Sequence, residues 1–126
     1  MRILVVDDNR DGAESMATGL RLLHHEVRTA FNGGSAVKLS GVFRPHLVLL
    51  DIEMSGIDGY ETCRVIRKLL GGGVRVVATT GLNDAEDRQR SAEAGFDAHW
   101  AKPVDWTLMK QMLLAWDPAI GTTTLR

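Results

Sequence analysis

The sequence predicts a single doubly wound α/β domain of the (βα)5 type, in which five parallel strands alternate with five helices. Short apolar runs alternate with longer segments in which apolar residues recur at helical spacing, a rhythm typical of a parallel sheet covered by helices on both faces. The length of 126 residues also suits one domain. The five apolar runs, which we expect to be strands, are residues 3–6, 27–31, 47–50, 74–78 and 98–101.

Four of the five expected helices have a clear apolar face. The first, with Asn9 as its N-cap and His24 and His25 at its end, presents Ala13, Met16, Ala17, Leu20 and Leu23. The other three faces are marked by Ala36, Leu39, Ser40 and Phe43, by Cys63, Ile66, Leu69 and Leu70, and by Trp106, Met109, Met112, Leu113 and Trp116. Cys63 is the only cysteine, and its place on such a face favours a packed side chain over a reactive thiol.

The fourth helix, at about residues 84–94, differs because its non-polar positions are mostly alanines: Ala85, Ala92 and Ala94. Alanines bury little area at roughly 25 cal/mol per Å², so we expect a weakly anchored helix that shifts at small cost. The alternative is that the alanines pack tightly against the sheet. The run 71–73 is expected to be a loop, residues 1–117 one domain, and residues 118–126 a C-terminal tail.

The bulk composition argues against several classes of function. The chain has 44% hydrophobic and 25% charged residues and a net charge of -1, so it has no overall field that would attract nucleic acid or an anionic membrane. The N-terminal apolar run stops at Asp7 before a signal-peptide core forms, and no segment approaches the roughly 20 apolar residues of a membrane span. We therefore expect a cytoplasmic protein without direct nucleic acid or membrane binding.

Polar residues follow four of the expected strands: Asp7 and Asp8, Asp51, the Thr79–Thr80 pair, and Lys102. Because ligands of parallel sheets collect at the carboxyl ends of the strands, we expect these groups to converge there. Three carboxylates in one place repel one another unless a cation neutralises them, and oxygen ligands suit Mg2+ (or Mn2+). Asp51 can then attack phosphorus as a nucleophile, with Lys102 and the Thr80 hydroxyl stabilising the transferred group.

Five motifs together resemble the receiver domains of two-component (His-Asp phosphorelay) signalling. They are Asp7-Asp8-Asn9, the run from Leu49 to Met54 around Asp51, Asp58-Gly59, Thr80-Gly81 and Lys102-Pro103-Val104, and they span nearly the whole chain. Each motif alone is weak evidence, but their shared order and spacing is specific. The resemblance implies a flavodoxin-like, CheY-like fold with strand order 2-1-3-4-5.

The resemblance also implies a role for each site residue. Asp51 is similar to the phosphoacceptor, Asp8 to a direct magnesium ligand, Asp7 to a ligand acting partly through water, and Glu53 to a ligand acting through its backbone carbonyl. Lys102 is similar to the lysine that contacts the phosphoryl group, and the Lys102-Pro103 bond is expected to be cis. Such a domain catalyses its own phosphorylation and dephosphorylation, but acts mainly as a switch.

Thr80, rather than Thr79, is the expected switch threonine, because Gly81 follows it and leaves room for phosphoryl oxygens. In the family this threonine moves toward the phosphoryl group, an aromatic residue three positions before the lysine turns inward, and the surface of helix 4, strand 5 and helix 5 changes. Here that position is His99, so we hypothesise pH-dependent activation, with an exposed histidine that has no switching role as the alternative.

Some positions depart from the family pattern. Ser55 stands where the family usually has proline, which is expected to loosen the loop after Asp51. Glu53 and Leu82 lie where receivers tune the lifetime of the acyl phosphate. An apolar Leu82 cannot orient an attacking water, so we expect slow self-hydrolysis, which an unchanged half-life in Leu82→Glu would contradict.

Three alternative functions fit these residues less well. An aspartate-nucleophile phosphatase needs a second carboxylate two residues beyond Asp7, where Asn9 stands. A flavin carrier needs a phosphate-binding first loop, which Asp7 and Asp8 would repel. A receiver that works without phosphorylation would not need the complete residue set. The resemblance implies a histidine kinase or histidine phosphotransfer domain as donor, and a downstream protein or linked domain as target. We expect either a free-standing receiver or part of a larger regulator or hybrid kinase.

Overall fold

The computed structural model describes residues 1–54, 58–81 and 85–117, and it confirms the predicted fold class. Five parallel strands form one sheet in the order β2-β1-β3-β4-β5. The strands are β1 (Arg2–Val6), β2 (Glu26–Ala30), β3 (Leu47–Asp51), β4 (Arg75–Thr80) and β5 (Ala98–Ala101). The helices are α1 (Arg10–Leu22), α2 (Gly33–Phe43), α3 (Gly59–Leu70), α4 (Ala85–Ala94) and α5 (Trp106–Trp116). The expected tail at 118–126 lies outside the described residues.

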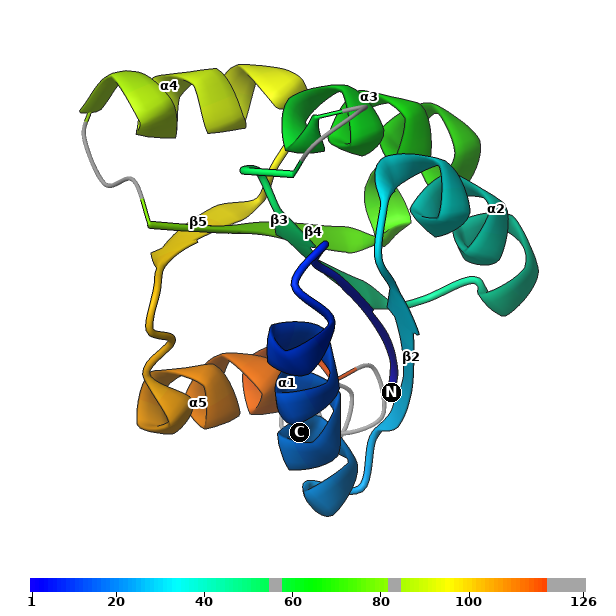
Figure 1. The fold of residues 1–126 in the computed structure, drawn as a ribbon, viewed down its shortest axis with the longest axis vertical. Coiled ribbons are helices and arrows are strands. Elements are labelled where there is room, and N and C mark those ends of the chain that lie inside the picture. The colour runs from blue at the N-terminus through cyan, green and yellow to red at the C-terminus, as the bar shows by residue number, and fades with distance from the viewer. Residues whose placement is uncertain (55–57, 82–84, 118–126) are drawn as a thin grey trace, which may run out of the picture.

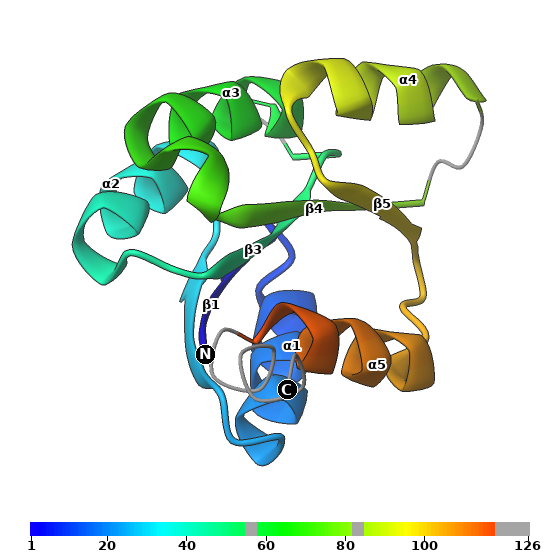
Figure 2. The same cartoon turned by 180° about the vertical axis from the view of Figure 1, so that it is seen from behind.

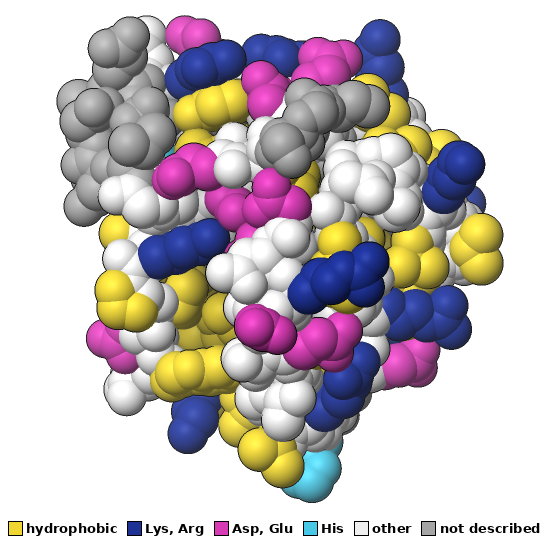
Figure 3. Space-filling view, in the orientation of Figure 1, with side chains coloured by type: hydrophobic (Ala, Val, Ile, Leu, Met, Phe, Trp, Pro, Cys, Tyr) yellow, Lys and Arg dark blue, Asp and Glu magenta, His cyan; other side chains and the backbone are white. Residues whose placement is uncertain are grey.

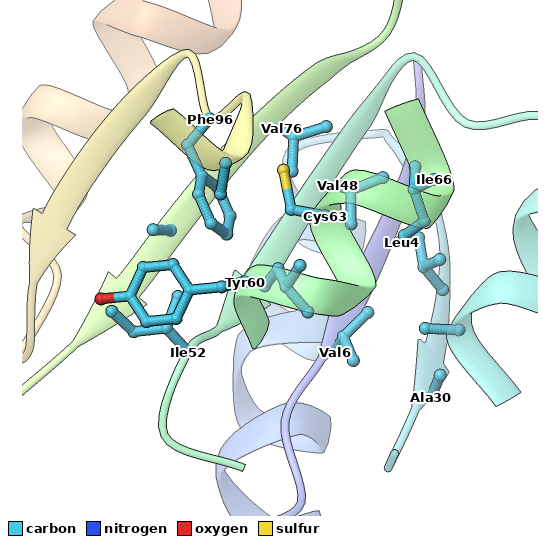
Figure 4. Packing of buried hydrophobic residues seen from close by; sticks show 14 of the residues in the cluster. Leu4, Val6, Ala30, Val48, Ile52, Tyr60, Cys63, Ile66, Val76 and Phe96 are labelled. Carbon is cyan, nitrogen blue, oxygen red and sulfur yellow. The ribbon is translucent and has the colours of Figure 1, made fainter. Parts of the chain in front are cut away.

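The sheet lies between two helical layers, with α1 and α5 on one face and α2, α3 and α4 on the other (Figures 1 and 2). Successive residues of a strand point to opposite faces, so each strand contributes to both halves of the core. Leu4 and Val6 pack under α2 and α3 (Figure 4), whereas Ile3 and Val5 pack under α1 and α5. The central strand β3 is buried along its whole length, which explains its uninterrupted apolar run.

Side-chain caps set where several helices begin. Asn9 is the N-cap of α1, as predicted, and its Oδ1 accepts from the Gly12 amide at 3.0 Å. Asn32, Asp58 and Asp105 cap α2, α3 and α5 in the same way. Each cap satisfies an amide that the helix leaves without an internal partner, so the chain turns sharply from strand end to helix.

Three local expectations were wrong. Residues Gly71–Gly73 form a short 3-10 helix, η1, because the chain continues to turn after α3. Leu69 was expected on the packed face of α3, but it is 49% exposed, since Tyr60, Cys63 and Ile66 face the sheet. Ala92 of α4 is exposed, and Ser91 is buried in its place, where its hydroxyl has a hydrogen-bond partner on β5.

Among residues 1–54, 58–81 and 85–117, none of the helices combines the length and apolar content that a membrane crossing requires.

Candidate phosphoacceptor and metal site

Three carboxylates meet where β1 and β3 end. Val6 lies opposite Leu50 in the parallel register, so Asp7, just after β1, lies beside Asp51, the last residue of β3. Asp7, Asp8 and Asp51 each place one carboxylate oxygen within 4.8 Å of the others. Acidic side chains gather near the centre of the face that Figure 3 shows. The predicted convergence of these residues is therefore present in the structure.

Asp51 is the most buried member of this cluster, with 3% of its surface exposed. Burial raises the pKa of the Asp51 carboxyl, and the nearby Asp7 carboxylate raises it further, while the Glu53 amide and Lys102 ammonium oppose both effects. The Glu53 amide donates to Asp51 Oδ1 at 2.9 Å. A positive charge beside Asp51 would stabilise its ionised form, which is the form that can act as a nucleophile.

Lys102 supplies one such charge. Its Nζ lies 3.2 Å from Asp51 Oδ2 and 3.3 Å from Asp7 Oδ2. Burial lowers the pKa of Lys102, but the Asp51 and Asp7 carboxylates outweigh it, and the pKa is raised overall. The residue is held at the end of β5 by its amide, which donates to the Thr80 carbonyl at 2.8 Å. The Lys102-Pro103 peptide bond is cis, as the resemblance implied.

Thr79 and Thr80 end β4 and face opposite sides of the sheet. Thr80 is fully buried, and its hydroxyl donates to Glu53 Oε1, which also accepts from the Gly81 amide at 2.6 Å. Thr79 instead lies opposite Asp51 in the register and lines a hollow of about 410 Å³ between the sheet, α1 and the start of α5. From the sequence, Glu53 was expected to bind the metal through its backbone carbonyl and to tune the lifetime of the acyl phosphate, but nothing in the sequence indicated this side-chain contact with Thr80 and Gly81.

Gly59 is a second residue whose importance the sequence showed only indirectly, through the Asp58-Gly59 motif. It is the first residue of α3, and Asp58 caps that helix by accepting from the Glu61 amide at 2.8 Å. A Cβ at position 59 would lie 2.8 Å from the Asp51 carbonyl oxygen and would overlap Ile52 Cα. The absence of a side chain thus lets α3 press directly against the backbone that carries the phosphoacceptor candidate.

His99 lies on β5, which β4 separates from β3 and the carboxylate cluster, and it is partly buried. Its Nδ1 is 3.0 Å from the Ser91 hydroxyl of α4, so the position expected to switch is joined to the helix expected to move. Two other predicted positions, Leu82 and Ser55, lie outside the described residues.

The donor set fits a hard divalent cation. The three clustered ligands are carboxylates at the edge of a sheet, Asp8 is exposed to solvent, and Asp51 is buried with a raised pKa that a cation would lower. Among the described residues the cluster contains no histidine or cysteine, which argues against a zinc site.

Comparison with known proteins gives consistent matches. The model of the response regulator receiver domain family matches residues 3–114. The transcriptional regulatory protein PrrA of Mycobacterium tuberculosis is 36% identical over 102 residues, which cover 81% of this chain and 43% of PrrA. The sensor histidine kinase RcsC of Salmonella typhimurium is 34% identical over 123 residues, 98% of this chain and 13% of RcsC.

Solved structures agree in fold. The BeF3-activated N-terminal receiver domain of RstA from Klebsiella pneumoniae superposes with a TM-score of 0.83 at 26% identity, over 93% of this chain and 99% of that one. The chain spans less than half the length of PrrA and a small part of RcsC.

Proposed function

The chain belongs to the response regulator receiver domain family of two-component systems, and from this premise we propose that Asp51 accepts a phosphoryl group in a reaction that depends on Mg2+ (or Mn2+). The observation that carries the proposal is the meeting of three carboxylates and the Lys102 ammonium at one edge of the sheet. The RstA receiver domain is described as BeF3-activated, and BeF3 resembles a phosphoryl group, which supports a phosphoryl site in this chain as well. Residues 1–117 would form this receiver domain.

Asp8 and Asp51 would hold the cation directly, Asp7 partly through water, and Glu53 through its backbone carbonyl. Bound there, the cation would neutralise carboxylates and phosphoryl oxygens together. The protein itself contributes by orienting the Asp51 carboxylate and by placing a positive charge beside it. Lys102 lies within reach of Asp51 Oδ2 and would contact a phosphoryl oxygen as well, while the Glu53 amide keeps the carboxylate oriented.

In the transfer, a carboxylate oxygen of Asp51 attacks the phosphorus of a phosphohistidine on a histidine kinase or phosphotransfer domain. A P–O bond to Asp51 forms as the P–N bond of the donor breaks, and the leaving imidazole keeps the electron pair and takes up a proton. Thr80 would then bind a phosphoryl oxygen, and the surface of α4, β5 and α5 would change for a downstream partner or a linked domain. The chain would act as a signalling switch.

The test is to incubate the chain with Mg2+ and a small phosphodonor such as phosphoramidate, and to measure the intact mass. We expect the wild-type mass to increase by one phosphoryl group and Asp51→Asn to remain unmodified, because an amide oxygen is a poor nucleophile. A phosphoryl group on Asp51→Asn at the wild-type level would refute the assignment of Asp51.

We further propose that His99 connects the switch surface to α4 through its contact with Ser91. Because His99 Nδ1 lies 3.0 Å from the Ser91 hydroxyl, losing the imidazole should weaken the packing of α4 over β5. In hydrogen exchange, we expect α4 of His99→Ala to be less protected than α4 of the wild type. Equal protection in the two proteins would exclude this contact as a support of α4.

A further inference from the structure

The Glu53 side chain already occupies two donors at the phosphoacceptor site. It reaches from the segment after β3 to the end of β4, where its Oε1 accepts from the Thr80 hydroxyl and, at 2.6 Å, from the Gly81 amide. A Cβ at Gly81 would lie 3.5 Å from Oε1 and 4.0 Å from Oε2 of Glu53, so the carboxylate lies directly against this glycine. The carboxylate of the chain's own Glu53 therefore occupies these two donors.

One of these donors, the Thr80 hydroxyl, is the group that the proposed function assigns to a phosphoryl oxygen, and the Gly81 amide follows it in the chain. A carboxylate oxygen and a phosphoryl oxygen are both anionic acceptors, and both form short, charge-assisted hydrogen bonds with hydroxyl and amide donors. The Thr80 hydroxyl carries a single proton, so it donates to only one of them at a time. The Glu53 amide donates to Asp51 Oδ1, which fixes the backbone from which the side chain reaches across. Glu53 is thus held where an incoming phosphoryl oxygen would have to go.

We propose that the Glu53 carboxylate is an internal competitor for the phosphoryl-oxygen site, and that it must leave Thr80 and Gly81 before a phosphoryl group can be held on Asp51. The proposal rests on the proposed function of Asp51. It makes Glu53 a positioning residue whose charge opposes phosphorylation, in addition to any effect on the lifetime of the product.

The proposal is distinguishable from control of an attacking water. A residue that only guides water changes the rate of dephosphorylation and leaves the binding of an unreactive analogue unchanged. A competitor changes that binding directly, because the analogue needs the donors that Glu53 holds. Beryllium fluoride with Mg2+ is such an analogue of the phosphoryl group, and its binding to Asp51 is an equilibrium.

The experiment measures the affinity for beryllium fluoride in excess Mg2+ by calorimetry, for wild type, Glu53→Gln, Glu53→Ala and Glu61→Gln. Glu53 is solvent-exposed, so its replacement should leave the fold intact. Glu61 is a matched control, because it is an exposed glutamate in the first turn of α3 whose ion pair is with Arg64. Neutral Glu53→Gln removes the charge and weakens the competing hydrogen bonds, so we expect binding about tenfold tighter.

Glu53→Ala should bind at least as tightly as Glu53→Gln, and Glu61→Gln should match the wild type. The initial rate of phosphorylation by phosphoramidate should rise in parallel with affinity. Unchanged or weaker binding in both Glu53 variants would overturn the competitor proposal and leave the proposed function standing. Absence of binding in all four proteins would overturn the proposed function, and the competitor proposal with it.

Discussion

Asp8→Asn is expected to weaken Mg2+ binding by roughly 100-fold, which corresponds to about 3 kcal/mol. Asp8 contributes one of the three clustered carboxylates, and asparagine keeps its size while removing its charge. The remaining pair, Asp7 and Asp51, already shares the Lys102 ammonium, which reduces their attraction for a second cation. Isothermal titration with Mg2+ measures the effect.

Asp11→Asn is the control for this substitution. Asp11 is an exposed aspartate in the first turn of α1, only a few residues along the chain, and it is not part of the clustered set. It should bind Mg2+ as the wild type does. Equal losses in both variants would mean that the general negative charge of this end of the molecule, and not the cluster, attracts the cation.

Gly59→Ala is expected to lower the free energy of unfolding by about 3 kcal/mol, near the upper end of overpacking effects. The added Cβ would meet the Asp51 carbonyl oxygen at 2.8 Å and overlap Ile52 Cα, and backbone atoms cannot move aside as a flexible side chain does. Either α3 or the end of β3 must shift. Phosphorylation should therefore be slowed as well, because the same backbone carries Asp51. Urea unfolding and the phosphoramidate rate measure the two effects.

Gly41→Ala separates the steric effect from the general effect of replacing a glycine. Gly41 lies within α2, where a Cβ would be at an ordinary 3.6 Å from Leu69 Cδ2. Alanine is favoured over glycine inside a helix by roughly 0.5–1 kcal/mol, so this variant should be slightly more stable than the wild type. A similar loss of stability in both variants would show that the close contact of Gly59 with β3 is not the cause of the destabilisation in Gly59→Ala.

The fold was predictable from the sequence because its signals are repeated along the whole chain. The apolar runs are buried strands, and an all-apolar run such as residues 47–50 is required of a strand covered on both faces. The apolar run at 74–78 corresponds to β4, which begins one residue later, at Arg75, and includes the two threonines expected at its end. Threonine suits a strand because its branched side chain packs well on a pleated surface.

The site was predictable as far as it depends on topology. Asp7, Asp8, Asp51 and Lys102 converge because parallel strands bring their carboxyl ends to one edge. The contact of Glu53 with Thr80 was not predictable, because it depends on the rotamer of a long side chain outside the strand. The burial of Ser91 was missed for a related reason, because the hydrogen-bond partner of its hydroxyl, His99, lies on a different element.

The central claim is that Asp51 can accept phosphorus only while a cation is held between the ends of β1 and β3. Its most direct test is the phosphoryl content of wild-type protein treated with phosphoramidate in excess chelator, and again after Mg2+ is restored. We expect no modification in chelator and full modification once Mg2+ returns. Phosphorylation of Asp51 to the same extent without a divalent cation would contradict the claim.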